Sequence, residues 1–146
     1  MDTIKTLVVE DMEPILKRYC QILVRDEHIE VVGAAQNGYQ AVMLAVTEKP
    51  DVILMDYYWP EHARKKYGDR ERGGEISMDT LRQIRQALPD LPVISYTIKP
   101  DREVLDSAYA NGVTFFLEKV AMAVPEVHNA LKYIIIYLMR NKSGWN

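Results

Sequence analysis

Apolar residues along the 146-residue chain alternate between short continuous runs and longer segments with helical spacing. The short runs predict strands at residues 6–9, 29–35, 52–55, 93–96 and 114–117. The longer segments predict helices at residues 14–25, 39–48, 78–88, 102–111 and 123–140. Because residues 52–55 are apolar at successive positions, this strand is expected to be buried on both faces, as in a parallel sheet. The pattern predicts a doubly wound α/β domain with helices on both faces of the sheet.

The alternation extends over about residues 4–140 and contains neither an internal repeat nor a linker. We therefore expect the whole chain, residues 1–146, to form a single domain. The one interruption is at residues 61–76, where mixed charges and glycines replace apolar side chains. This composition predicts a long polar surface loop.

Composition narrows the classes of partner. The formal net charge of −3 leaves no excess of Lys and Arg to neutralise phosphates, which argues against nucleic acid and anionic membranes. The single cysteine, Cys20, excludes an internal disulfide, and the histidines do not lie at zinc-ligand spacing with it. The longest apolar stretch, residues 133–139, is too short to span a bilayer, and no signal peptide is recognisable. These features predict a cytoplasmic protein.

Chemically informative residues follow the predicted strands. Glu10 and Asp11 come after the first strand, Asp56 after the third, Thr97 after the fourth and Lys119 after the fifth. In an open parallel sheet, ligands bind beyond the carboxyl ends of the strands, so we expect these residues to converge. Three carboxylates without His or Cys suit a hard divalent cation, most simply Mg²⁺. With a lysine opposite, the pocket is arranged to receive a phosphoryl group on a carboxylate nucleophile.

Four ordered motifs carry a resemblance to a known family. They are residues 7–11 (LVVED), residues 52–56 (VILMD) followed by Pro60, residues 92–97 (PVISYT), and Phe116 with Lys119. Together they resemble the receiver domain of two-component response regulators, over about residues 4–140. The resemblance implies a flavodoxin-like (βα)5 fold, with the parallel strands in the order 2-1-3-4-5.

The resemblance also implies roles for individual residues. Asp56 is the expected phosphoacceptor. A sensor histidine kinase or a phosphotransfer protein is expected to supply the phosphoryl group. Mg²⁺ is expected on Glu10, Asp11, Asp56 and the backbone carbonyl of Tyr58. The phosphate-binding and switch residues are expected to be Thr97, Lys119 and Phe116. Such a domain is not an enzyme beyond its own phosphorylation and dephosphorylation, and its product is a change in protein contacts.

Other interpretations remain open at this point. A receiver-like binding module that signals without phosphate is favoured by the bulky Ile98 after Thr97 and by the long loop. A phosphohydrolase of the haloacid-dehalogenase type would need a second aspartate two residues after the first, where this chain has Tyr58. The pair Glu10 and Asp11, taken alone, also suits the start of a helix.

The last predicted helix has two apolar stripes. We expect one of them to face the core, and it comprises Val127, Leu131, Ile134 and Leu138. The second comprises Tyr133, Ile136 and Tyr137. Because an exposed apolar stripe usually marks a contact surface, we expect this one to meet a homodimer partner, another protein or an effector domain.

Overall fold

The computed structural model describes residues 3–56, 76, 78–97, 102–118, 133, 135–137 and 140. Five parallel strands form one sheet in the order β2-β1-β3-β4-β5, which confirms the predicted fold class and strand order. The strands are β1 (Ile4–Val9), β2 (Ile29–Ala35), β3 (Val52–Met55), β4 (Val93–Thr97) and β5 (Phe115–Glu118). The helices with complete bounds are α1 (Glu13–Leu23), α2 (Gly38–Glu48), α4 (Met78–Ala87) and α5 (Arg102–Ala110).

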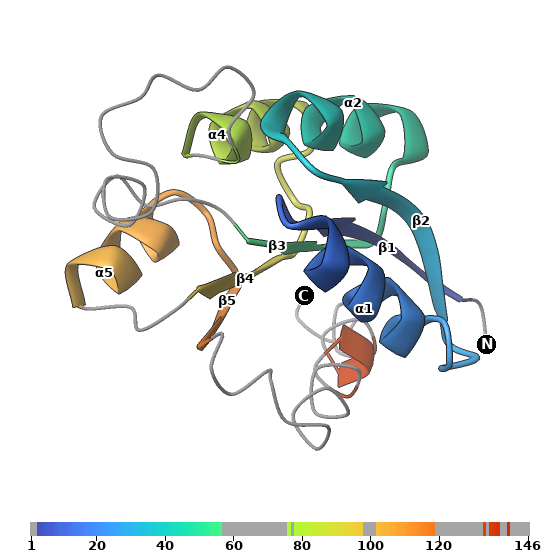
Figure 1. Cartoon of the computed structure of the whole chain (residues 1–146). Helices are drawn as coiled ribbons and strands as arrows, with labels where there is room; N and C mark the ends of the chain where they lie inside the picture. The colour runs from blue at the N-terminus through green and yellow to red at the C-terminus, as the bar shows by residue number, and fades with distance from the viewer. Residues whose placement is uncertain are drawn as a thin grey trace.

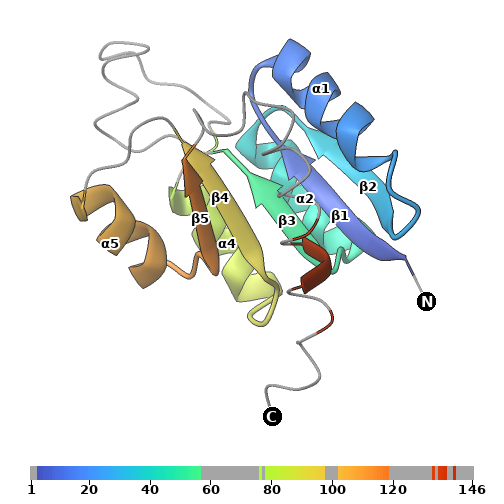
Figure 2. The ribbon, with the colours of Figure 1, turned by 90° about the horizontal axis from the view of Figure 1, so that it is seen from below.

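Helices cover both faces of the sheet (Figures 1 and 2). α2 and α4 lie on one face, α1 and the described part of the last helix lie on the other, and α5 flanks β5. Two separate groups of buried side chains follow from this arrangement, one on each face. All four residues of β3 are fully buried, as expected for a central strand covered on both sides.

The helix ends have local causes. The side chain of Asn37 accepts a hydrogen bond from the backbone N–H of Gln40 at 2.9 Å and caps the start of α2. α2 ends at Glu48, and the capping residue Lys49 that follows has a left-handed φ of 46°. At α1, Pro14 occupies the first turn, where its missing N–H costs no helical hydrogen bond.

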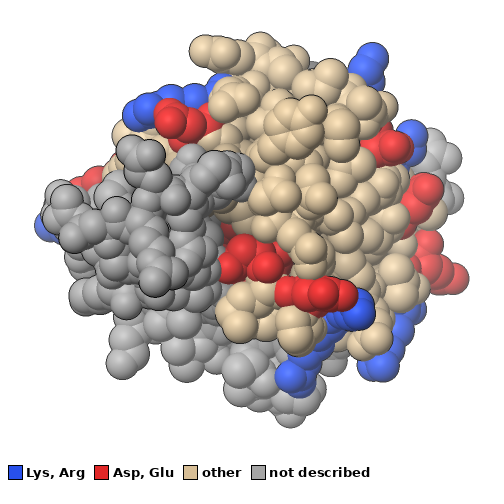
Figure 3. All heavy atoms as spheres, turned by 45° about the horizontal axis from the view of Figure 1, so that its top comes forward, with Lys and Arg blue, Asp and Glu red and all other residues tan. Residues whose placement is uncertain are grey.

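α2 is apolar on its solvent side as well as on its buried side. Tyr39, Met43 and Val46 are 75%, 47% and 47% exposed. Figure 3 shows that the described surface over this helix is largely uncharged. Within α2 the only ionisable acid or base among Asp, Glu, Lys and Arg is Glu48, its last residue. This helix therefore brings no cation toward the carboxylates at the edge of the sheet.

The predicted long loop lies outside the described residues, except for Ile76. This side chain is 1% exposed and belongs to the core between the sheet and α2 and α4, so it is not part of a polar surface loop. No helix in the described part of the chain is long and apolar enough to cross a membrane.

Candidate functional site

The pairing of β1 with β3 builds the centre of the site. Val9 is opposite Met55, so Glu10 and Asp56 follow at the same edge of the sheet. The backbone N–H of Asp56 donates to the carbonyl oxygen of Val9 at 2.9 Å, which extends the strand pairing by one residue. Carboxylate oxygens of Glu10, Asp11 and Asp56 consequently lie within 4.8 Å of one another. The structure brings together the three acids that the strand ends predict.

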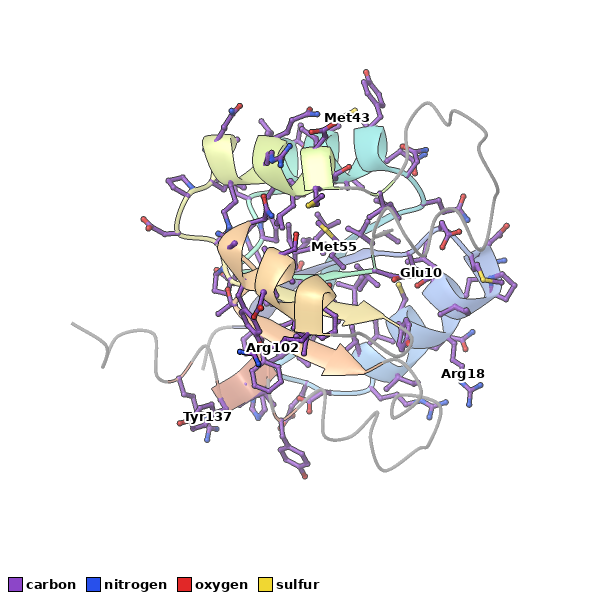
Figure 4. All side chains as sticks on the ribbon, turned by 90° about the vertical axis from the view of Figure 1, so that its left-hand side faces the viewer. Glu10, Arg18, Met43, Met55, Arg102 and Tyr137 are labelled. Carbon is purple, nitrogen blue, oxygen red and sulfur yellow. The ribbon has the colours of Figure 1, made fainter. Side chains whose placement is uncertain are left out.

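The three carboxylates differ in burial. Glu10 is 0% exposed and Asp56 is 5% exposed, whereas Asp11 is partly exposed. Asp11 is therefore the most exposed of the three carboxylates. Glu10 projects at the end of β1 beside the start of α1 (Figure 4).

Glu10 also serves the backbone. Its Oε1 accepts a hydrogen bond from the backbone N–H of Met12 at 3.2 Å. Met12 precedes α1 and makes no side-chain cap bond of its own. The helix-start interpretation thus holds for one oxygen of Glu10, and the same carboxylate still belongs to the acidic cluster. This hydrogen bond fixes the orientation of the carboxylate.

The electrostatics of the cluster call for a positive partner. Like charges this close repel one another unless protons or a cation neutralise them. The donor set consists only of carboxylate oxygens. Such oxygens suit a hard divalent cation such as Mg²⁺ better than they suit Zn²⁺ or copper. The residues present therefore fit a magnesium site.

A neighbouring acid on α1 stays outside the cluster. Glu13 forms an exposed ion pair with Lys17 at 2.9 Å. The hydrogen bond and charge of Lys17 lower the pKa of Glu13 below its usual value. Since Glu13 is close in sequence but separately paired, it is a natural comparison for the clustered acids.

The remaining predicted site residues are placed only in part. Thr97 ends β4 and pairs with Glu118 of β5. Phe116 pairs with Ser95 and is partly buried against the core between the sheet and α2 and α4. Tyr58 and Lys119 lie outside the described residues, as does the side chain of Thr97.

The last helix differs from its prediction at one residue. Tyr133 and Tyr137 are 71% and 62% exposed, in keeping with the outward stripe. Ile136 is partly buried and packs against the core on the α1 side of the sheet. Ile135, which the predicted core stripe leaves out, is fully buried there. The outward surface is thus formed by the two tyrosines rather than by all three predicted residues.

Sequence reasoning overlooked Ser95. This residue of β4 is fully buried, although its hydroxyl is polar. The available signal is a serine on an otherwise apolar strand beside the acid-terminated strand β3.

Comparison with known proteins decides the family. A model of the response regulator receiver domain matches residues 6–132. The chain belongs to this family. The receiver domain of Thermotoga maritima CheB has the same fold, with a TM-score of 0.71 at 23% identity over 99% of this chain and 98% of that one. The prediction made from the four motifs is confirmed.

Similar full-length proteins are longer than this receiver domain. It is 47% identical over 113 residues to protein-glutamate methylesterase/protein-glutamine glutaminase 4 of Hahella chejuensis, covering 77% of this chain and 26% of that protein. A protein of the same description from Pseudomonas fluorescens is 34% identical over 77% of this chain and 27% of its own length. The chain spans about a quarter of the length of these relatives.

Proposed function

We propose that this receiver domain accepts a phosphoryl group on Asp56 from a histidine kinase or a phosphotransfer protein, and that the modification switches its protein contacts. The position of Asp56 is the main support for this proposal. Asp56 is 5% exposed, follows a fully buried strand and lies within 4.8 Å of two other carboxylates. Burying a charge there is unfavourable. A role as nucleophile accounts for a carboxylate at this position.

Few side chains take part in the proposed phosphoryl transfer. A carboxylate oxygen of Asp56 attacks the phosphorus of a phosphohistidine, a P–O bond forms, and the P–N bond breaks as the departing imidazole takes up a proton. The product is an acyl phosphate at the end of β3. By family resemblance, Lys119 pairs with the phosphoryl oxygens, Thr97 donates to one of them, and Phe116 moves into the space that Thr97 leaves. The chemistry of this domain is confined to the gain and loss of that group.

Mg²⁺ would be held by Glu10, Asp11, Asp56 and the backbone carbonyl of Tyr58. When bound, the ion neutralises phosphoryl oxygens and polarises the phosphorus for attack. Two features of the chain favour binding of the ion. The N–H of Met12 orients Glu10, and Asp11 is partly exposed.

Intact mass after incubation with acetyl phosphate and Mg²⁺ tests the proposal. We expect one added phosphoryl group on the wild type and none on Asp56→Asn. Asp79→Asn is the matched control, because Asp79 is an exposed aspartate that pairs with Arg82 and is not a member of the acidic cluster. Asp79→Asn should be modified like the wild type. An unmodified wild type would favour the phosphate-independent binding module instead.

Calorimetric titration with Mg²⁺ tests the metal site separately. Asp11→Ala should weaken Mg²⁺ binding at least about tenfold, since it removes one of few hard oxygen ligands. Glu13→Ala removes a carboxylate two residues away that is already paired with Lys17. It should leave the affinity within about twofold. Equal weakening by both variants would indicate a diffuse charge effect rather than a metal site.

The outward surface of the last helix is proposed as the contact that phosphorylation modulates. Tyr133 and Tyr137 are exposed one helical turn apart. The occupant can be a second copy or an effector, and similarity to the methylesterases favours an effector of that kind.

Sedimentation with and without beryllofluoride, a phosphoryl mimic, distinguishes these occupants. If the occupant is a second copy, beryllofluoride should change the sedimenting mass of the wild type. The double variant Tyr133→Glu/Tyr137→Glu should abolish this change. A wild type that is monomeric in both states excludes self-association. If the occupant is an effector, the receiver domain should bind the remaining part of the Hahella chejuensis methylesterase. Beryllofluoride should then change that affinity at least about tenfold.

A further inference from the structure

Ser95 is a polar residue inside the apolar core. Its side chain is 0% exposed, and its Oγ has no hydrogen-bond partner among the residues that the structure describes. Buried hydroxyl groups are nearly always hydrogen-bonded, because leaving one unpaired costs the free energy of its lost hydration. An alanine would fill nearly the same space without this cost.

The strand register shows what surrounds Ser95. It is opposite Met55 of β3 on one side and Phe116 of β5 on the other. Side chains of directly paired residues lie on the same face of a sheet, and Met55 points toward the layer of α2 and α4 (Figure 4). Ser95 therefore lies between the residue that precedes the phosphoacceptor and the expected switch aromatic.

The neighbourhood offers Ser95 mostly apolar contacts. Met55, Val93 and Val113 are buried members of the core on this face, and Phe116 packs against it while remaining partly exposed. Serine is also smaller than the apolar residues that dominate this layer.

We propose that Ser95 is a positioning residue for the switch, through a hydroxyl that is unpaired in the arrangement seen here and becomes hydrogen-bonded in the phosphorylated one. This inference rests on the proposed phosphorylation of Asp56. A residue shifts a two-state equilibrium only by the difference between its free energies in the two states. The unpaired hydroxyl disfavours the unphosphorylated state and so lowers the free energy needed to leave it.

The experiment measures beryllofluoride affinity in the presence of Mg²⁺ by calorimetry on the full chain. Ser95→Ala removes the hydroxyl at nearly constant size and should weaken binding about fivefold to tenfold, while raising the Tm of the free protein. Ser95→Val also fills the space beside Phe116 and should weaken binding further.

Thr6→Val is the matched control. Thr6 is another fully buried residue with a hydroxyl on a central strand, but its Oγ1 donates to the carbonyl oxygen of Ile4 at 3.3 Å, near the opposite edge of the sheet. This variant should change the Tm without changing beryllofluoride affinity by more than about twofold. Thr6→Val thus separates general core damage from an effect on the switch.

Two outcomes overturn the inference and are distinguishable. If the wild type binds beryllofluoride and Ser95→Ala binds it equally well, the hydroxyl has the same free energy in both states, as when a buried water serves it throughout. The positioning role is then wrong and the phosphoacceptor function stands. If the wild type does not bind beryllofluoride at all, the proposed function fails and the role of Ser95 fails with it.

Discussion

At the C-terminal edge of the sheet, three carboxylates lie within 4.8 Å of one another, whereas at the N-terminal edge one guanidinium is shared among backbone carbonyls. Arg85 of α4 donates from Nη1 to Pro89 at 3.2 Å and to Leu91, both before β4. Its Nη2 donates to Gly112, before β5. Burial lowers the pKa of Arg85 and nearby Asp90 opposes that shift.

The two edges are expected to contribute to stability with opposite signs. The carbonyl groups of Leu91 and Gly112 that Arg85 binds are in partly buried positions, where losing a charge-assisted hydrogen bond is costly, so these bonds favour the folded chain. The clustered carboxylates repel one another and favour unfolding unless protons or a cation neutralise them. The polar side chain at one edge thus stabilises the fold, whereas the clustered carboxylates at the other edge oppose it.

The largest expected effect is the loss of Arg85. Arg85→Met should lower the free energy of unfolding by about 3 kcal/mol, because charge-assisted hydrogen bonds to two partly buried carbonyls disappear together. Arg85→Lys should lose about half as much, since an ammonium does not reproduce the guanidinium fork. Urea denaturation measures both.

Arg82→Met is the control for Arg85. Arg82 lies one turn earlier on α4 and pairs with Asp79 at 3.2 Å in an exposed position. Its loss should change stability by no more than about 0.5 kcal/mol. If Arg85→Met is as stable as Arg82→Met, the N-terminal edge is not fastened by this side chain, and the contrast between the two edges fails.

At the C-terminal edge, removing a charged side chain is expected to raise the free energy of unfolding rather than lower it. In metal-free buffer, Asp56→Asn should raise the free energy of unfolding by about 2 kcal/mol. Two unit charges 4 Å apart repel by about 4 kcal/mol at a typical effective dielectric, and proton uptake relieves part of this repulsion. Saturating Mg²⁺ should stabilise the wild type more than the variant and so reduce the difference. Asp79→Asn should show neither effect, and a destabilised Asp56→Asn would contradict mutual repulsion at this edge.

The fold and the acidic cluster were accessible from the sequence because both depend on local patterns. Runs such as residues 52–55 predict buried parallel strands, and parallel strands place their final residues at one edge. Glu10, Asp11 and Asp56 could therefore be brought together without coordinates.

Contacts between distant residues were not accessible in this way. Arg85 reads as an ordinary polar position on an amphipathic helix, and nothing local links it to Gly112, 27 residues later. Ser95 reads as a strand residue, and only its neighbours reveal whether its hydroxyl is paired.

The last helix illustrates a second limit. Periodicity fixes the angles between side chains on a helix but not the rotation of the helix against the sheet. With apolar residues at successive positions, residues 133–139 fit more than one rotation. Packing selects the rotation that buries Ile135 and partly buries Ile136.

The smallest effect concerns how Gly112 and Arg85 depend on each other. Gly112 has a φ of 98°, and a Cβ built on it would lie 2.6 Å from Nε of Arg85. Gly112→Ala should therefore lose stability through backbone strain of about 1–2 kcal/mol and through displacement of the guanidinium. Only the second contribution requires Arg85.

A double-mutant cycle isolates that contribution. In the Arg85→Met background, Gly112→Ala should retain only the backbone strain, so its effect should be smaller than in the wild type by about 1 kcal/mol. Urea denaturation of the four proteins gives this coupling. Additive losses would mean that the arginine bends aside without losing its bond to the carbonyl of residue 112.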